Sequence, residues 1–93
     1  MLPLHRTAIP VPDVVDASLD EGEMALLHLG TRTYFSLNRT GARIWAHLKE
    51  GRTLEDVSRL LHEEFDVRLD DARRSVVQMV DALAQHRLVD APR

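Results

Sequence analysis

The spacing of apolar residues changes once along this 93-residue chain, near residue 38. Before this point apolar and polar residues alternate with the two-residue period of β-strands, and after it apolar residues recur every three or four positions, as on helices. We therefore predict an α+β fold in which a three-stranded antiparallel sheet is followed by three helices, similar to a winged helix. The predicted strands lie at about 15–19, 23–29 and 33–37, and the predicted helices at about 39–49, 53–65 and 71–86.

Local signals mark several ends of these elements. Within residues 15–19 apolar side chains occupy alternate positions, which predicts a half-buried strand. Asn38 and Thr53 are good N-caps for the first two helices, and Asp70 is expected to cap the third. Gly51 suits the end of the first helix, because glycine readily adopts the left-handed backbone conformation found there.

The composition excludes several classes of protein. The chain has no cysteine, which rules out disulfides, thiolate metal sites and a cysteine nucleophile. Its 12 basic and 15 acidic side chains give a net charge of −3, whereas phosphate binding needs an excess of Lys and Arg. No apolar run approaches the ~20 residues of a membrane span, and the first residues lack the pattern of an export signal. We expect a cytoplasmic module without a membrane partner.

The beginning of the chain differs from the rest. Prolines at positions 3, 10 and 12 predict that residues 1–12 are a flexible N-terminal arm, which leaves residues 13–93 as a single domain. Residues 1–37 carry two basic and five acidic side chains, a net charge of −3, while residues 38–93 carry ten of each. The sheet-forming part is therefore acidic, which favours a partner with some basic character.

No pattern in the sequence predicts catalysis, a cofactor or a metal site. The five histidines are at least 15 residues apart, whereas a metal-binding pair on one helical face needs a spacing of about three or four. The acidic pairs lie at predicted helix ends, where capping is the simpler role. We therefore expect a protein that is not an enzyme.

A winged-helix DNA-binding regulator is the alternative. The third helix would then be the recognition helix, with Arg73, Arg74 and Gln78 contacting bases or phosphates. Against this, the same helix carries acidic residues and its half of the chain has no net charge. The expectation is therefore that nucleic acid is not a partner.

The third predicted strand, Thr33–Leu37, has an unprotected edge. Natural sheet edges are usually guarded by Lys, Pro or charged side chains, and this strand contains none of them. Phe35 and Leu37 are expected to face the core, and Tyr34 and Ser36 the opposite side. Such an edge either accepts a peptide strand or is covered by a helix or by the N-terminal arm, and the sequence leaves both possibilities open.

The third predicted helix has an apolar arc of about 160°, wider than the ~100° that core contact requires. The core stripe is predicted to be Ala72, Val76, Met79 and Leu83, and the extension is formed by Val77, Val80 and Ala84. Arg73 projects within the extension. This flank is either a second candidate binding surface or a surface buried against another helix. An edge strand and an apolar helix flank together suggest a groove between them.

Two segments carry a resemblance to a known family. They read L-D-E-G-E-M-A-L-L-H-L-G-T-R-T-Y-F-S-L-N-R-T-G-A-R-I-W from Leu19 to Trp45, and E-G-R-T-L-E-D-V from Glu50 to Val57. With the ending D-A-L-A-Q-H-R-L-V from Asp81 to Val89, they resemble the PqqD-like family, named for coenzyme PQQ synthesis protein D. The sequence is more similar to stand-alone modules of lasso-peptide and other gene clusters than to the PQQ protein itself.

The resemblance implies a non-catalytic adaptor that binds the leader segment of a ribosomally made precursor peptide. The leader would add as a strand to the third strand beside the third helix. It would then be presented to a modifying enzyme such as a radical SAM enzyme, a cyclase or a leader peptidase. The chain is expected to be a monomer or a weak dimer, and pairing of the bare edge with a copy of itself is a further possibility. The expected peptide contacts are Thr33, Tyr34, Phe35, Ser36, Leu37, Arg73, Val77, Val80, Asp81 and Ala84.

Overall fold

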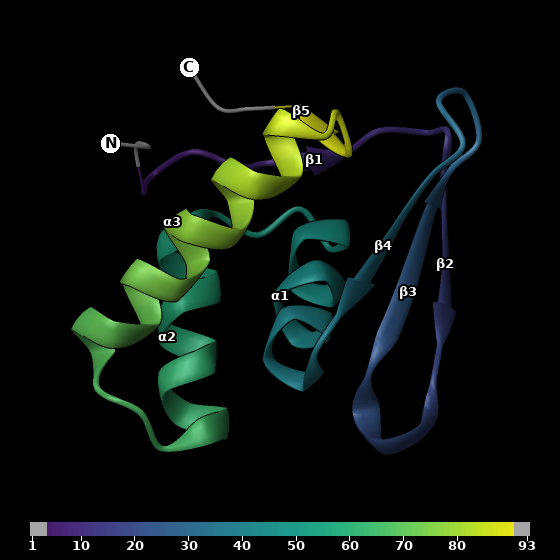
Figure 1. Cartoon of the computed structure of the whole chain (residues 1–93). Coiled ribbons are helices and arrows are strands. Elements are labelled where there is room, and N and C mark those ends of the chain that lie inside the picture. The colour runs from purple at the N-terminus through teal and green to yellow at the C-terminus, as the bar shows by residue number, and fades with distance from the viewer. Residues whose placement is uncertain (1–3, 91–93) are drawn as a thin grey trace.

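The computed structural model describes residues 4–90, in which a three-stranded sheet lies beside three helices (Figure 1). The predicted α+β fold is confirmed, and its likeness to a winged helix is only loose. The elements are β1 Ile9–Pro10, β2 Val14–Ser18, the 3₁₀ turn η1 Asp20–Gly22, β3 Met24–His28, β4 Thr33–Leu37, α1 Arg39–Lys49, α2 Leu54–Phe65, α3 Leu69–Gln85 and β5 Val89–Asp90. None of the helices described is long and apolar enough to cross a membrane.

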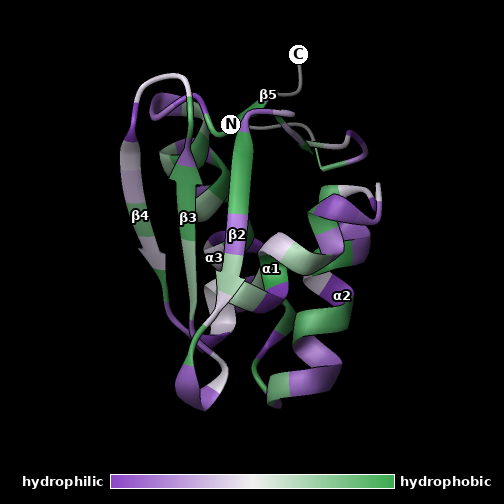
Figure 2. Cartoon of the chain, turned by 90° about the vertical axis from the view of Figure 1, so that its right-hand side faces the viewer, coloured by the Kyte–Doolittle hydropathy of each residue, from purple (hydrophilic) through white to green (hydrophobic). Residues whose placement is uncertain are grey.

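The larger sheet has the antiparallel order β2-β3-β4, so β2 and β4 are its edges (Figure 2). Tight turns join the strands, with Gly22 in the first (φ 80°) and Arg32 in the second (φ 58°). His28 supports the second turn, because its Nδ1 accepts hydrogen bonds of 3.1 and 3.2 Å from the N–H groups of Gly30 and Thr31. These short connections keep consecutive strands paired as neighbours.

Strand β2 buries the face opposite to the one its apolar residues predicted. Val15 is 49% exposed and Ala17 is also exposed, whereas Asp16 faces helix α1. The Asp16 carboxylate accepts hydrogen bonds from Lys49 Nζ at 2.7 Å and from Trp45 Nε1 at 2.8 Å. These two bonds hold the pKa of Asp16 below its ordinary value. A polar residue occupies the inner position because it satisfies the indole N–H of a buried tryptophan.

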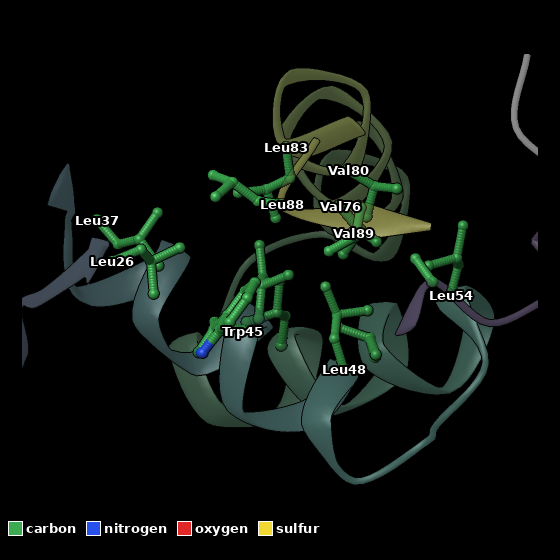
Figure 3. Packing of buried hydrophobic residues seen from close by; sticks show 14 of the residues in the cluster. Leu26, Leu37, Trp45, Leu48, Leu54, Val76, Val80, Leu83, Leu88 and Val89 are labelled. Atoms are coloured by element: carbon green, nitrogen blue, oxygen red, sulfur yellow. The ribbon is translucent and has the colours of Figure 1, made fainter. Parts of the chain in front are cut away.

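One apolar core lies between the inner face of the sheet and the helices (Figure 3). Trp45 and Leu48 of α1 are each 1% exposed, and Leu26 of the central strand is fully buried against the same cluster. Val80, which was expected to contact a peptide, is also fully buried. Helix α3 packs against α2, and this contact places Val80 in the same core cluster as Leu83. Val80 is therefore a core residue.

The predicted caps of the first two helices are confirmed. The side chains of Asn38 and Thr53 each accept a hydrogen bond from a backbone N–H, at 2.8 and 3.1 Å. The predicted cap of α3 is wrong, because the helix begins at Leu69, one residue before Asp70. Asp70 instead lies in the first turn, where a carboxylate interacts favourably with the helix dipole, and pairs with Arg73 at 3.4 Å.

The N-terminal segment is attached to the helical side of the molecule. Leu54 and Glu55 of α2 donate backbone hydrogen bonds of 2.8 Å to carbonyls of this segment, and Ala8 is fully buried. Strand β1 then pairs antiparallel with β5. Residues 4–12 thus make more contacts than the predicted flexible arm implies, and the rest of that prediction falls on residues 1–3, outside the described part. Strand β1 pairs with β5 and leaves the edge of β4 uncovered.

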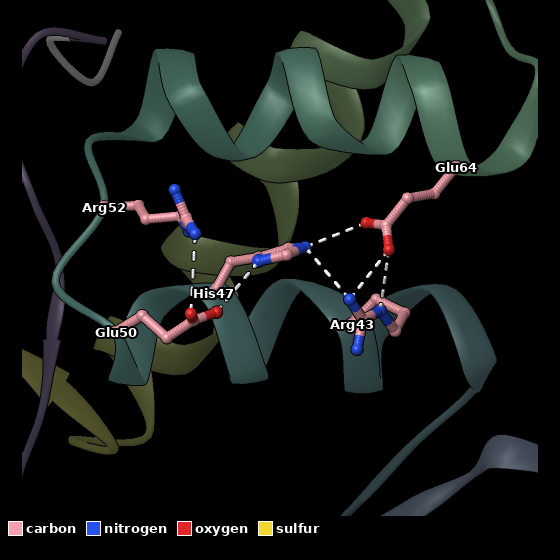
Figure 4. Close-up of polar contacts among 5 residues, drawn as sticks. All are labelled: Arg43, His47, Glu50, Arg52 and Glu64. Carbon is pink, nitrogen blue, oxygen red and sulfur yellow. Dashed lines mark hydrogen bonds and ion pairs between the residues drawn. The ribbon is translucent and has the colours of Figure 1, made fainter.

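A polar cluster joins α1 to α2 (Figure 4). His47 is 5% exposed, and its ring nitrogens lie 2.8 Å from Glu64 Oε1 and 3.2 Å from Glu50 Oε1. Arg43 donates two hydrogen bonds to Glu64 Oε2, at 2.7 and 3.1 Å. Burial raises the pKa of Glu64, but the hydrogen bonds from His47 and Arg43 outweigh this effect and hold it below its ordinary value. The pKa of Glu50 is also lowered, first by its bond to His47.

Candidate functional site

Strand β4 is a sheet edge with its outer backbone groups unpaired by any strand within residues 4–90. Phe35 is half-buried and Leu37 is 5% exposed, both packed against the core, while Tyr34 is 63% exposed and Ser36 is exposed. The predicted alternation of inward and outward side chains in this strand is therefore confirmed. Because no charge or proline interrupts β4, its free edge is suited to pairing with another strand.

An open groove of about 480 Å³ runs beside the end of β4, between the start of α1 and the middle of α3. Its lining residues are Ser36, Leu37, Asn38, Thr40, Gly41, Ile44, Ser75, Gln78 and Met79. None of these side chains carries a formal charge. The groove is therefore suited to uncharged side chains, since a charged group entering it would lose hydration without gaining an ionic partner.

Helix α3 presents one consistent face to β4. Ser75 and Met79 line the groove, and at ~100° per residue Ala82 and His86 follow within about 60° of them on the helix surface. The His86 ring lies against the ring of Phe35, with centroids 5.1 Å apart and a tilt of 59°. This contact marks the place where β4 and the C-terminal end of α3 come together.

The flank of α3 predicted from the sequence lies on the other side of the helix. Arg73 is directed at Glu55 of α2, and Val77 lines a separate cavity of about 260 Å³ beside the N-terminal segment. Val77 is about 160° from Met79 around the helix axis. Asp81 is exposed and Ala84 half-buried, and the same helical geometry places both of them away from the β4 side. The structure thus brings the five β4 residues together with a different set of α3 residues.

The position of Arg73 is explained by its ionic partners. Its guanidinium donates three hydrogen bonds to the Glu55 carboxylate, at 2.6, 3.0 and 3.2 Å, and one to Asp70 at 3.4 Å. The Glu55 bonds raise the pKa of Arg73, and the same bonds hold the pKa of Glu55 below its ordinary value. Arg73 thus ties α3 to α2.

Gly41 sets the width of the groove where α1 approaches β4 and α3. A Cβ atom at this position would lie 3.3 Å from Asn38 Oδ1, 3.4 Å from Met79 Sδ and 3.5 Å from Leu37 Cβ. A side chain here would therefore press on the groove wall. Sequence reasoning gave Gly41 only a structural role and placed Met79 in the core. The signal that was available was the repeat of Ser75, Met79 and His86 on one helix face.

A metal centre is not supported by the side chains that the structure places. Between residues 4 and 90 there is no group of three His, Asp or Glu side chains arranged to hold a metal ion. The histidines make local contacts instead. His28 supports a turn, His47 lies between two glutamates and His86 contacts an aromatic ring.

The fold and its open edge define a small α+β domain in which one sheet edge lies beside an uncharged groove. The family model for coenzyme PQQ synthesis protein D (PqqD) matches residues 23–89, and the chain belongs to this family. The resemblance found in the sequence is therefore confirmed. A search of curated proteins gives no match.

Two solved structures are similar over most of the chain. The structure titled "TbiB1 in Complex with the TbiA(beta) Leader Peptide" has a TM-score of 0.82 and 35% identity, covering 88% of this chain and 94% of that one. The structure titled "Lasso peptide synthetase B1 complexed with the leader peptide" has a TM-score of 0.80 and 30% identity, covering 89% of this chain and 96% of that one.

Proposed function

We propose that this chain is an adaptor that binds the leader segment of a ribosomally made precursor peptide. The leader adds as a fourth strand to β4 and lies over the groove beside α3. The observation that carries the proposal is the unpaired, uncharged edge of β4 next to an uncharged groove. The two similar structures, both titled as complexes with leader peptides, support it.

Strand addition supplies both affinity and selectivity. A fourth strand lies about 4.8 Å from β4 and pairs with its free N–H and C=O groups. Alternate side chains of the leader point into the groove, and the others lie on the outer side of the sheet. The proposed contacts are Thr33, Tyr34, Phe35, Ser36 and Leu37 of β4, with Ser75, Gln78, Met79, Ala82 and His86 of α3.

The adaptor performs no chemistry in this proposal. Holding the leader raises the effective concentration of the attached precursor near a partner enzyme. A radical SAM enzyme, a cyclase or a leader peptidase are the candidate partners, and a cytoplasmic location remains part of the proposal. Residues 13–93, with the attached segment before them, act as one peptide-binding unit.

The DNA-binding alternative has less support. Arg73 is engaged by Glu55 and Asp70, and Arg74 pairs with Asp71 at 3.3 Å. Each basic side chain that would contact phosphate on α3 thus already has a carboxylate beside it. Affinity for a phosphate backbone depends on an excess of such cations.

Peptide titration with two exposed positions of α3 tests the proposal. Ser75 lines the groove, whereas Arg74 is exposed and borders the cavity on the opposite flank. In Ser75→Trp the indole fills the groove, so the Kd for a fluorescein-labelled leader rises about tenfold or more. Arg74→Trp is the matched control and leaves the Kd within about twofold, because it removes only an exposed ion pair.

The ligands are the precursor encoded beside the gene for this chain and the TbiA(beta) leader bound by the relative. Circular dichroism of both variants confirms that they fold. Equal affinity in the two variants, or a loss confined to Arg74→Trp, contradicts the proposed groove.

A further inference from the structure

The outer face of the sheet carries an apolar surface that the leader groove does not use. Val15, Leu27 and Tyr34 are aligned across the three strands by the pairing register and are 49%, 38% and 63% exposed. The sheet is seen from this side in Figure 2, with hydrophobic segments on β2 and β3. The helices pack against the opposite face, so these three side chains, the outer row, remain in contact with solvent.

A second row on the same face has small side chains. Ala17, Ala25 and Ser36 are aligned by the same register, two residues further along each strand. The two rows are about 7 Å apart, since a strand rises ~3.4 Å per residue. The face therefore consists of a ridge of large side chains beside a shelf of small ones.

This arrangement is complementary to itself. A two-fold axis that lies between the rows and runs across the strands places each ridge over the shelf of the other copy. Leu27 then lies over the second copy's Ala25, and Tyr34 over its Ser36. Aligned sheets packed face to face need this kind of interlocking at a separation of about 10 Å.

The charges at the two ends of the sheet are also complementary under this axis. Asp20, Glu21 and Glu23 are exposed at the turn beyond the shelf, and Arg32 is exposed at the turn beyond the ridge. Among residues 4–90, none of the four takes part in an ion pair. The same rotation brings the Arg32 end of one copy to the acidic end of the other.

We propose that a second copy of this chain covers the outer face, forming a two-fold symmetric dimer of stacked sheets. The interface is self-complementary, as a two-fold symmetric contact requires. The free edge of β4 and its groove lie outside the interface, so the proposal does not depend on leader binding.

Analytical ultracentrifugation of the full chain, from micromolar to millimolar concentration, tests the dimer. Leu27→Asp removes an outer-row side chain that is 38% exposed, and Val67→Asp, which is 39% exposed in the α2–α3 connection, is the matched control. The wild-type chain and Val67→Asp are expected to dimerise as concentration rises. Leu27→Asp weakens the dimer about tenfold or more, since its carboxylate would be buried without a partner.

A charge exchange tests the orientation of the two copies. Arg32→Glu alone weakens the dimer, and the second change Glu23→Arg restores it in the double variant. A wild-type chain that stays monomeric throughout overturns the proposal, as does a dimer that Leu27→Asp leaves intact, which points to pairing through the β4 edge. Failure of the double variant to recover overturns the two-fold arrangement. A monomer that binds a processing enzyme through Leu27 assigns the face to that enzyme instead.

Discussion

Replacing Glu64 by glutamine tests whether the polar cluster between α1 and α2 stabilises the fold. The Glu64 carboxylate accepts hydrogen bonds from Arg43 at 2.7 and 3.1 Å and lies 2.8 Å from His47 Nε2. The His47 side chain is 6% exposed, while those of Arg43 and Glu64 are 46% and 31% exposed. Glu64→Gln keeps the size of the side chain and removes its charge.

The expected loss follows from these exposures. The Arg43–Glu64 pair is largely in solvent, where such pairs contribute at most about 1 kcal/mol. The contact with the buried His47 is worth more, about 1–2 kcal/mol, because a polar group there has little access to water. Glutamine retains one acceptor oxygen, so we expect a net loss of about 1.5 kcal/mol in the free energy of unfolding. For a chain of this size that corresponds to a fall in Tm of roughly 6–12 °C.

Urea denaturation followed by circular dichroism measures this loss, with Glu63→Gln as the matched control. Glu63 is the neighbouring residue on α2, is exposed, and takes part in no ion pair within residues 4–90. Both changes remove one negative charge near the C-terminal end of the helix, so their effects on the helix dipole cancel in the comparison. Equal stabilities of the two variants would refute this account of the cluster.

The pH dependence gives a second check. The pKa of Glu64 is lower in the folded chain than its ordinary value. Such a carboxylate stabilises the fold above its unfolded pKa of about 4.3, and this contribution is lost as pH falls through the folded value. The difference between wild type and Glu64→Gln should therefore be full at neutral pH and shrink in acid. A difference that stays constant down to strongly acid pH contradicts it.

Two further changes test the link between sheet and helices and the width of the groove. Asp16→Ala leaves the buried indole N–H of Trp45 without an acceptor, so unfolding by urea should show a loss of about 1–3 kcal/mol; an unchanged midpoint would show that this bond is replaceable. Gly41→Val places a branched side chain against Met79, and leader titration should show weaker binding at unchanged helical content. Normal affinity in that variant would place the peptide elsewhere.

The sequence predicted the elements well because each signal was local. The apolar periods located the strands and helices, and the side chains of Asn38 and Thr53 were read correctly as caps. The free edge of β4 was also predictable, since alternation determines which side chains of Phe35 and Leu37 face inward.

The errors concerned which neighbour covers each surface. In β2 the apolar residues face outward, because Asp16 has hydrogen-bonding partners inside. In α3 the apolar arc was measured correctly, but its width does not tell which flank contacts the sheet. Arg73 and Val77 lie away from β4 because the salt bridge to Glu55 fixes that side of α3 against α2. Such choices depend on residues far apart in the sequence.

Hydrogen exchange of the backbone amides tests the central claim most directly. In the free chain, alternate amides of Thr33–Leu37 point away from β3 and should exchange rapidly. When the leader is added, the account predicts that these amides become protected by about tenfold or more, while the amides of the other sheet edge, Val14–Ser18, do not change. Protection at Val14–Ser18, or binding that protects no amide of Thr33–Leu37, would contradict strand addition at β4.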